Sequence, residues 1–298
     1  MNPRQLEAFR AVMTTGTTTR ASDLMHTSQS AISRLVSQLE ATLRLKLFDR
    51  DGARLRPTPE AKALLIEVER MFAGMDVIRE RATSLREGRS GILTIASLPA
   101  LGYGPLPALI TQLRCDLPDL LIRYEIHSSQ EVRERVASGQ CDVGFAAELI
   151  DTHGLVARSI ARRRAVLAVP ADHVLGQRSR VSLFDLVDYP FIALPSKDTS
   201  RRQLDAMLAN RGKKLNVVIE AAYTLTVASM VCHGAGIGLV DPLSVEMFDW
   251  HGVRFVEVDE PIWFNTLAIH NMSTPLSAPA SKLLALADAA WNGAGHER

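Results

Sequence analysis

The chain of 298 residues is long enough for two or three domains of ordinary size. Its 47% apolar and 22% charged residues fall within the range of globular proteins, and no segment approaches the roughly 18 consecutive apolar residues of a membrane span. The polar N-terminus lacks the apolar core of a secretory signal, which predicts a cytoplasmic chain without a membrane partner. The cysteines Cys115, Cys141 and Cys232 match neither a zinc motif nor a disulfide framework. We therefore expect three small buried hydrophobic residues here, and no metal or cofactor.

The net charge of +1 is unevenly distributed along the chain. Residues 1–58 contain nine Lys and Arg against five Asp and Glu, whereas the remainder is slightly acidic. A basic N-terminal segment is consistent with a polyanionic partner, although a solvated basic face gives the same composition.

The first 45 residues have the pattern of three short helices. Apolar residues recur at helical spacing over residues 4–14, Gly16 ends that helix, and a second helix fits residues 17–25. Ser28 is a suitable N-cap for a third helix. One face of the third helix is apolar, with Ala31, Ile32, Leu35, Leu39 and Leu43. The opposite face carries hydrogen-bonding groups, which suit a helix that reads base edges: Gln29, Ser30, Ser33, Arg34 and Gln38.

A basic hairpin follows these helices. Asp51-Gly52 is a strong hairpin signal between two short strand-like runs, and Arg50, Arg54 and Arg56 flank it. Three helices followed by such a hairpin predict a winged helix-turn-helix that binds DNA. The alternative is a small helical bundle whose polar face is only solvated. The candidate DNA-binding residues are Thr27, Ser28, Gln29, Ser30, Ser33, Arg34, Arg50 and Arg54.

A long helix is predicted from Thr58 to about Leu85, because Thr58 can cap it and Pro59 suits its first position. A narrow apolar stripe runs along it at spacings of three and four. Such a stripe favours pairing with the same helix of a second chain, and the alternative is packing along the downstream domain. The stripe consists of Ala61, Leu64, Val68, Met71, Met75, Ile78, Ala82 and Leu85.

Beyond a hinge at residues 86–91, short apolar runs alternate with amphipathic helices, which predicts an α/β region with largely parallel pairing. We expect two smaller sheets with a cleft between them. Strands are expected at residues 92–96, 120–126, 143–146, 165–169, 191–194, 217–220, 237–240, 254–258 and 264–270. Helices are expected at residues 105–114, 130–138, 200–211, 225–233 and 279–291.

The stretch GTTTRASDLMHTSQSAISRLVSQLEATLRLKLFDRDGARLRPTPEA, from Gly16 to Ala61, resembles the DNA-binding segment of LysR-type transcriptional regulators. Three later segments are most similar to the lysine-biosynthesis and opine-catabolism members of that family: SLPALGYGPLP, SKDTSRRQLD and GAGIGLVDP. The resemblance covers the whole chain and implies an α+β multidomain fold. Its parts would be a winged helix-turn-helix at 1–58, a linker helix and hinge at 59–90, and a periplasmic-binding-protein-like effector domain at 91–298.

By this resemblance the effector domain has two α/β lobes, with lobe I at about 91–161 and 268–298 and lobe II at about 162–267. Ligands of such sheets bind beyond the carboxyl ends of strands, where helix N-termini offer backbone donors. These donors suit a carboxylate, and Glu148, Asp198 or Asp241 suits an ammonium group, so we expect an amino-acid-like or carboxylate effector. The alternative for each serine is an ordinary helix cap. The candidate effector-binding residues are Ser97, Leu98, Ser128, Ser129, Glu148, Thr199, Val240 and Asp241.

The resemblance implies a set of partners: double-stranded promoter DNA, a small-molecule effector, RNA polymerase, and further copies of the chain as a dimer through the linker helix and a tetramer. We expect no enzymatic activity. His233 and Cys232 are tied to no catalytic partner by a known spacing, and the glycines of GAGIG precede a strand instead of following one. A transport receptor of the same lobed fold is not expected either, because it would need a signal peptide, whose apolar core the N-terminus lacks.

Overall fold

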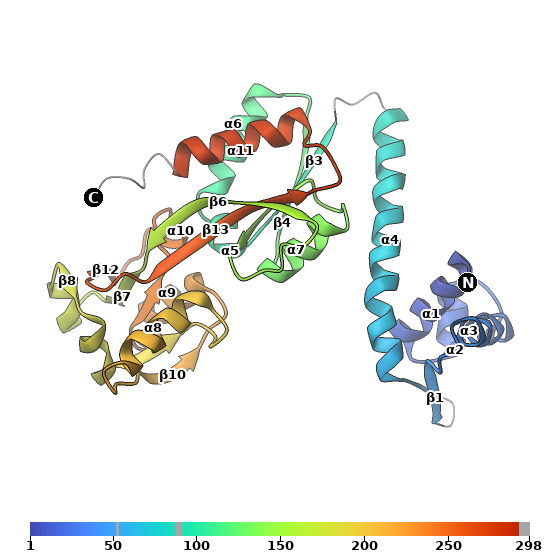
Figure 1. The fold of residues 1–298 in the computed structure, drawn as a ribbon, viewed down its shortest axis with the longest axis horizontal. Helices are drawn as coiled ribbons and strands as arrows, with labels where there is room; N and C mark the ends of the chain where they lie inside the picture. The colour runs from blue at the N-terminus through green and yellow to red at the C-terminus, as the bar shows by residue number, and fades with distance from the viewer. Residues whose placement is uncertain (52–53, 87–90, 292–298) are drawn as a thin grey trace. The chain divides into compact units, whose positions relative to one another are not determined.

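The computed structural model describes residues 1–51, 54–86 and 91–291. Contacts along the chain divide it into two compact units, Met1–Thr83 and Ser84–Arg298, which are described separately (Figure 1). In the described residues, no helix is long and apolar enough to cross a membrane.

The first unit opens with three helices, α1 (Pro3–Thr15), α2 (Thr18–Leu24) and α3 (Gln29–Leu43), as predicted. The Gly16 backbone has φ 74°, a conformation that favours glycine, and it ends α1. At the start of α3, the Ser28 hydroxyl accepts a hydrogen bond from the Ala31 N–H. The three helices share a core around Phe9, Ile32 and Leu39, which are fully buried.

The predicted hairpin is confirmed, with β1 (Phe48–Asp51) and β2 (Arg54–Pro57) paired antiparallel from Phe48↔Pro57 to Asp51↔Arg54. Residues 52–53 lie outside the described part. The Glu40 carboxylate of α3 accepts hydrogen bonds from the Leu47 N–H at 2.7 Å and the Phe48 N–H at 3.2 Å. These bonds attach the start of the hairpin to α3.

The long helix α4 (Pro59–Arg86) is capped by Thr58, whose hydroxyl accepts a hydrogen bond from the Ala61 N–H. The first half of its apolar stripe packs on the winged helix-turn-helix itself. Ala61 and Val68 are buried in that core, and the Arg10 guanidinium of α1 pairs with Glu69 of α4 at 2.8 Å. Placing the whole stripe against a partner helix or the downstream domain was therefore wrong for this half.

In the second unit, a five-stranded sheet has the order β4-β3-β5-β13-β6. Its strands are β3 (Ile92–Ser97), β4 (Leu121–Ile126), β5 (Val143–Ala147), β6 (Leu155–Arg164) and β13 (Trp263–Asn271). β4, β3 and β5 are parallel, whereas β13 is antiparallel to both β5 and β6.

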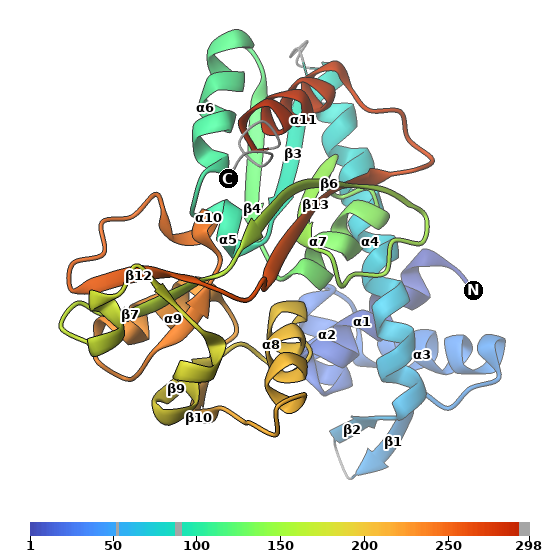
Figure 2. The same ribbon diagram turned by 60° about the vertical axis from the view of Figure 1, so that its left-hand side comes forward.

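Helices cover both faces of this sheet, and we call the sheet together with these helices lobe I (Figures 1 and 2). α6 (Leu106–Asp116) and α11 (Ala278–Trp291) lie over one face. α7 (Ser129–Ala137) covers the opposite face, where Val132 and Val136 are buried. The short helix α5 (Pro99–Gly102) follows β3.

Large apolar side chains attach the sheet of lobe I to α6 and α11. Ile95 of β3 and Phe145 of β5 are both fully buried in the core beneath these two helices. The ring of Phe145 packs edge-on against Trp291 at the end of α11, with 6.1 Å between the ring centroids. The last turn of α11 is thus fixed to a central strand of the sheet.

The remaining elements of the second unit form what we call lobe II, built on a four-stranded sheet of order β11-β7-β12-β8 and a parallel pair β10-β9. An isolated parallel bridge between Phe191 and Ile237 connects the two. The strands of lobe II are β7 (Val166–Pro170), β8 (Arg180–Val181), β9 (Pro190–Ala193), β10 (Asn216–Glu220), β11 (Gly238–Val240) and β12 (Val253–Val258). Its helices are η1 (Val174–Gln177), η2 (Leu183–Asp188), α8 (Thr199–Ala209), α9 (Thr224–Cys232) and α10 (Pro242–Val245).

The expectation of largely parallel pairing is only partly met in this lobe. β7, along which the chain enters lobe II, pairs antiparallel with both β11 and β12. The glycines of GAGIG lie between α9, which ends at Cys232, and β11, which begins at Gly238, so they precede a strand as expected.

The chain passes between the lobes twice, along β6 and β13, which run side by side in Figures 1 and 2. β6 ends at Arg164 and β13 begins at Trp263, whereas the crossings were expected near 161 and 267. At this joint the Ala165 N–H donates to the Ile262 carbonyl at 2.8 Å. A second contact joins the lobes, because Leu243 of α10 is buried in the core of lobe I.

The cysteines correct one expectation from the sequence. Cys141 is buried as expected, and burial raises the pKa of its thiol to about 12. Cys115 on α6 and Cys232 at the end of α9 are exposed, so the expectation of burial was wrong for these two.

Candidate functional site

The polar face of α3 is the first candidate site. Gln29, Ser30 and Arg34 are exposed, and Ser33 between them is half-buried. Arg34 makes no hydrogen bond with any residue in the described ranges, whereas the Gln29 amide donates to the Thr18 hydroxyl at 3.0 Å. The helix therefore presents hydrogen-bonding groups to solvent while its other face is buried in the three-helix core.

The residues before α3 have structural partners of their own. Ser28 is the N-cap, and its hydroxyl also lies 3.0 Å from the hydroxyl of Ser30. Thr27 is half-buried in the turn before the cap. The side chains of Arg50 and Arg54 lie outside the described part of the structure, although their backbones belong to β1 and β2.

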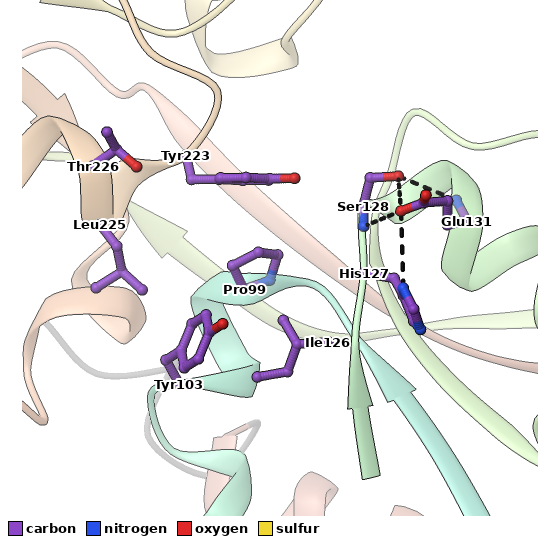
Figure 3. Close-up of a pocket in the computed structure, with 9 residues that line it drawn as sticks. All are labelled: Pro99, Tyr103, Ile126, His127, Ser128, Glu131, Tyr223, Leu225 and Thr226. Carbon is purple, nitrogen blue, oxygen red and sulfur yellow. Dashed lines mark hydrogen bonds and ion pairs between the residues drawn. The ribbon is translucent and has the colours of Figure 1, made fainter.

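The second candidate site is a cavity of about 320 Å³ in the second unit (Figure 3). Lobe I supplies the loop after β3 with α5 and the loop after β4 with α7, and lobe II supplies the start of α9. It is lined by Pro99, Tyr103, Ile126, His127, Ser128, Glu131, Tyr223, Leu225 and Thr226.

Glu131 and Ser128 form a capping box at the start of α7. The Ser128 N–H and hydroxyl both donate to Oε2 of Glu131, at 3.0 and 2.9 Å. These bonds favour the charged form and lower the pKa of the Glu131 carboxyl below its ordinary value.

Next to the capping box, His127 contacts a second carboxylate. Its Nε2 lies 2.8 Å from Oε2 of Glu125, and the Arg135 guanidinium lies 3.0 Å from the same oxygen. Arg135 is therefore paired with a carboxylate that is not in the cavity lining.

The structure distributes the predicted effector residues over several positions, and Ser128 is the one that lines this cavity. Ser97 is fully buried and donates to the Leu98 carbonyl, while Leu98 is half-buried as the residue before α5. The Ser129 hydroxyl accepts a hydrogen bond from the Ala147 N–H at 3.0 Å. Glu148 accepts from the Asn265 side-chain amide at 2.9 Å.

The lobe II candidates are also held in local structure. Thr199 is the half-buried first residue of α8, and the Asp198 side chain caps that helix. Val240 is fully buried in β11. Asp241 is buried and caps α10 by accepting the Leu243 N–H at 3.0 Å.

Most of the cavity lining was not predicted from the sequence, notably Tyr103, Glu131 and Tyr223. The strand-end rule that selected Ser128 would also have selected Tyr223, since it follows β10 and precedes α9. Glu131 carried a recognisable capping-box signal, serine followed by glutamate three residues later.

In the described residues, no group of three or more His, Cys, Asp or Glu side chains could hold a metal ion.

Comparison with known proteins decides the family. The model described as bacterial regulatory helix-turn-helix protein, lysR family, matches residues 3–62, and the LysR substrate binding domain matches residues 86–292. The chain belongs to the LysR family. It is a transcriptional regulator with an N-terminal helix-turn-helix and a C-terminal effector-binding domain.

Similar members of the LysR family agree with the resemblance drawn from the sequence. The regulatory protein NocR of Agrobacterium fabrum is 36% identical over 245 residues, 82% of each chain. The transcriptional activator protein LysR of Escherichia coli is 31% identical over 278 residues, 93% of this chain and 89% of that protein. The octopine catabolism/uptake operon regulatory protein OccR of Rhizobium meliloti is 34% identical over 250 residues, 83% of this chain and 82% of that protein.

A solved LysR-family structure has the same fold. CbnR in complex with its target DNA matches with a TM-score of 0.75 and 20% identity, covering 96% of this chain and 99% of that one. This similarity extends over both the winged helix-turn-helix and the two-lobed domain.

Proposed function

We propose that this LysR-family regulator binds promoter DNA in the cytoplasm through α3 and the hairpin, under the control of a small-molecule effector and with RNA polymerase as a partner. Gln29, Ser33 and Arg34 would reach base edges in the major groove, while Arg50 and Arg54 would contact the DNA backbone. The observation that carries this proposal is the exposed hydrogen-bonding face of α3, on a helix whose opposite face is buried.

Arg34 provides the test of DNA reading. Arg34→Ala should weaken binding to the promoter by about 1 to 3 kcal/mol and relax base preference at one position, because a bidentate contact to guanine is lost. Quantitative footprinting measures both effects. Arg114→Ala, which removes an exposed arginine of α6, is the matched control. Unchanged affinity and base preference in Arg34→Ala would exclude Arg34 from the reading residues.

We place the effector in the cavity between lobe I and lobe II. A ligand there touches α5 and α7 from one lobe and α9 from the other, so its affinity depends on how the lobes are arranged. An amino-acid-like effector fits the relatives, since the name of OccR refers to the catabolism and uptake of octopine.

A thermal-shift screen of amino acids and small organic acids should identify ligands, because a ligand that binds the folded state raises its stability. Thr226→Trp would fill the cavity from α9, where Thr226 is exposed. Calorimetry should then detect no binding of a ligand that binds the unaltered protein. Retained binding in Thr226→Trp would place the effector elsewhere.

We also propose that α4 pairs two chains, and that contacts between effector domains join two dimers into a tetramer. The support for pairing is that large apolar side chains on α4 are exposed to solvent. In the described part of the helix, Ile66, Met75 and Ile78 are 54%, 39% and 70% exposed. Val68, in contrast, is buried in the core of its own unit.

A further inference from the structure

We propose that the cavity recognises a cationic group of the effector, a guanidinium or an ammonium, through the Glu131 carboxylate and the rings of Tyr103 and Tyr223. This inference rests on the proposal that the cavity is the effector site. The sequence favoured a ligand carboxylate at helix N-termini and an ammonium group at Glu148, Asp198 or Asp241. The cation site proposed here uses none of these three residues.

The charge of the cavity lining supports a cation. Glu131 is the one carboxylate among the nine lining residues, all of them described, and neither lysine nor arginine is among them. The nearby Arg135 pairs with Glu125 at 3.0 Å, so its charge is largely compensated. The two carboxylates of Glu125 and Glu131 therefore face one guanidinium, that of Arg135.

The hydrogen bonds of Glu131 leave one oxygen available. Both bonds from Ser128 go to Oε2, and His127 Nδ1 lies 4.0 Å from that same atom. Oε1 has no hydrogen-bond partner among the described residues. The Ser128 donors that would have met a ligand carboxylate are already used by Glu131, which disfavours an anion at this position.

Two aromatic rings complete the cation site. Tyr103 follows α5 in lobe I and Tyr223 precedes α9 in lobe II, and they are 57% and 41% exposed. Figure 3 shows them on the two lobes facing the cavity, with the Tyr223 hydroxyl directed toward Ser128 and Glu131. A guanidinium or ammonium gains from the negative face of such rings, so a cation here would contact both lobes.

The test compares L-arginine with L-citrulline, which has nearly the same shape but a neutral urea group. Calorimetry on the full-length protein should show at least about tenfold weaker binding of citrulline than of arginine. L-lysine and agmatine are further cationic probes that separate an ammonium from a guanidinium.

Glu131→Gln tests the carboxylate itself, because glutamine can still complete a capping box. It should weaken arginine binding about fivefold or more and leave citrulline binding nearly unchanged. Glu134→Gln is the control, since Glu134 lies on α7 but is not in the cavity lining. Tyr223→Ala should weaken the cationic probes more than Tyr223→Phe does.

The outcomes separate this inference from the proposal beneath it. A neutral or anionic ligand could bind the unaltered protein and Glu131→Gln equally well but not bind Thr226→Trp. This result would overturn the cation site while keeping the cavity as the effector site. A ligand that still binds Thr226→Trp would overturn both. Absence of binding by all the cationic probes at millimolar concentration would also overturn the cation site.

Discussion

The buried carboxyl of Asp241 should make the stability of the protein depend on pH. Its side chain is 4% exposed and accepts one hydrogen bond from the Leu243 N–H at the start of α10. Burial raises the pKa of the Asp241 carboxyl from 3.8 to about 7. Leu243 itself lies in the core of lobe I, so Asp241 caps a helix of lobe II that packs against lobe I.

The sign of the effect follows from proton linkage. The folded protein holds the Asp241 proton up to about pH 7, whereas the unfolded chain releases it near pH 3.8. The free energy of unfolding therefore falls as pH rises between these values, by on the order of 4 kcal/mol in all. Roughly 3 kcal/mol of this loss occurs between about pH 5 and pH 8.

Asp241→Asn removes the titration and retains a side-chain oxygen that can accept from Leu243. Relative to the unaltered protein, the variant should gain stability from about pH 5 to pH 8 by roughly 3 kcal/mol. Denaturant unfolding followed by tryptophan fluorescence measures this, because Trp250, Trp263 and Trp291 all lie in the second unit. Asp119→Asn, at an exposed position, is the control. A difference that does not change with pH would refute the reasoning.

Two further predictions concern the first unit. Glu40→Ala should weaken binding to all DNA sequences alike and lower stability by about 1 to 3 kcal/mol, because the Leu47 and Phe48 N–H groups lose their acceptor; gel retardation with unchanged affinity would contradict it. Val68→Asp should unfold or strongly destabilise the first unit, as measured by circular dichroism, because Val68 is buried. Ile78→Asp, at an exposed position, should mainly reduce the size of the assembly in sedimentation. The reverse pattern would show that Val68 lies in the dimer contact.

Much of the fold was predictable because its signals are local. The caps at Ser28 and Thr58 and the stop at Gly16 each depend on a few neighbouring residues, and all three occur where the sequence indicates them. Strand β6 was missed, because Leu155–Arg164 contains four arginines and lacks a clear alternation. Its strand conformation depends on pairing along β13, which lies about a hundred residues later in the chain.

The site was less predictable, because the availability of a hydrogen-bonding group is a tertiary property. The sequence places Ser97, Ser128 and Ser129 at strand ends, and that placement is observed. Their hydroxyls, however, bond to Leu98, Glu131 and the Ala147 N–H within the protein. Residue type and spacing identify possible donors but do not show which of them are already satisfied.

The stripe on α4 illustrates the same difference for packing. A heptad-like pattern requires that something cover the apolar face, but it does not identify what covers it. Ala61 and Val68 are covered by the helices of their own unit, whereas Met75 and Ile78, farther along the same stripe, are exposed. Pairing through α4 would therefore use a different part of the helix from the part that stabilises the DNA-binding unit. Dissociation of the dimer and unfolding of that unit should consequently be separable by substitution.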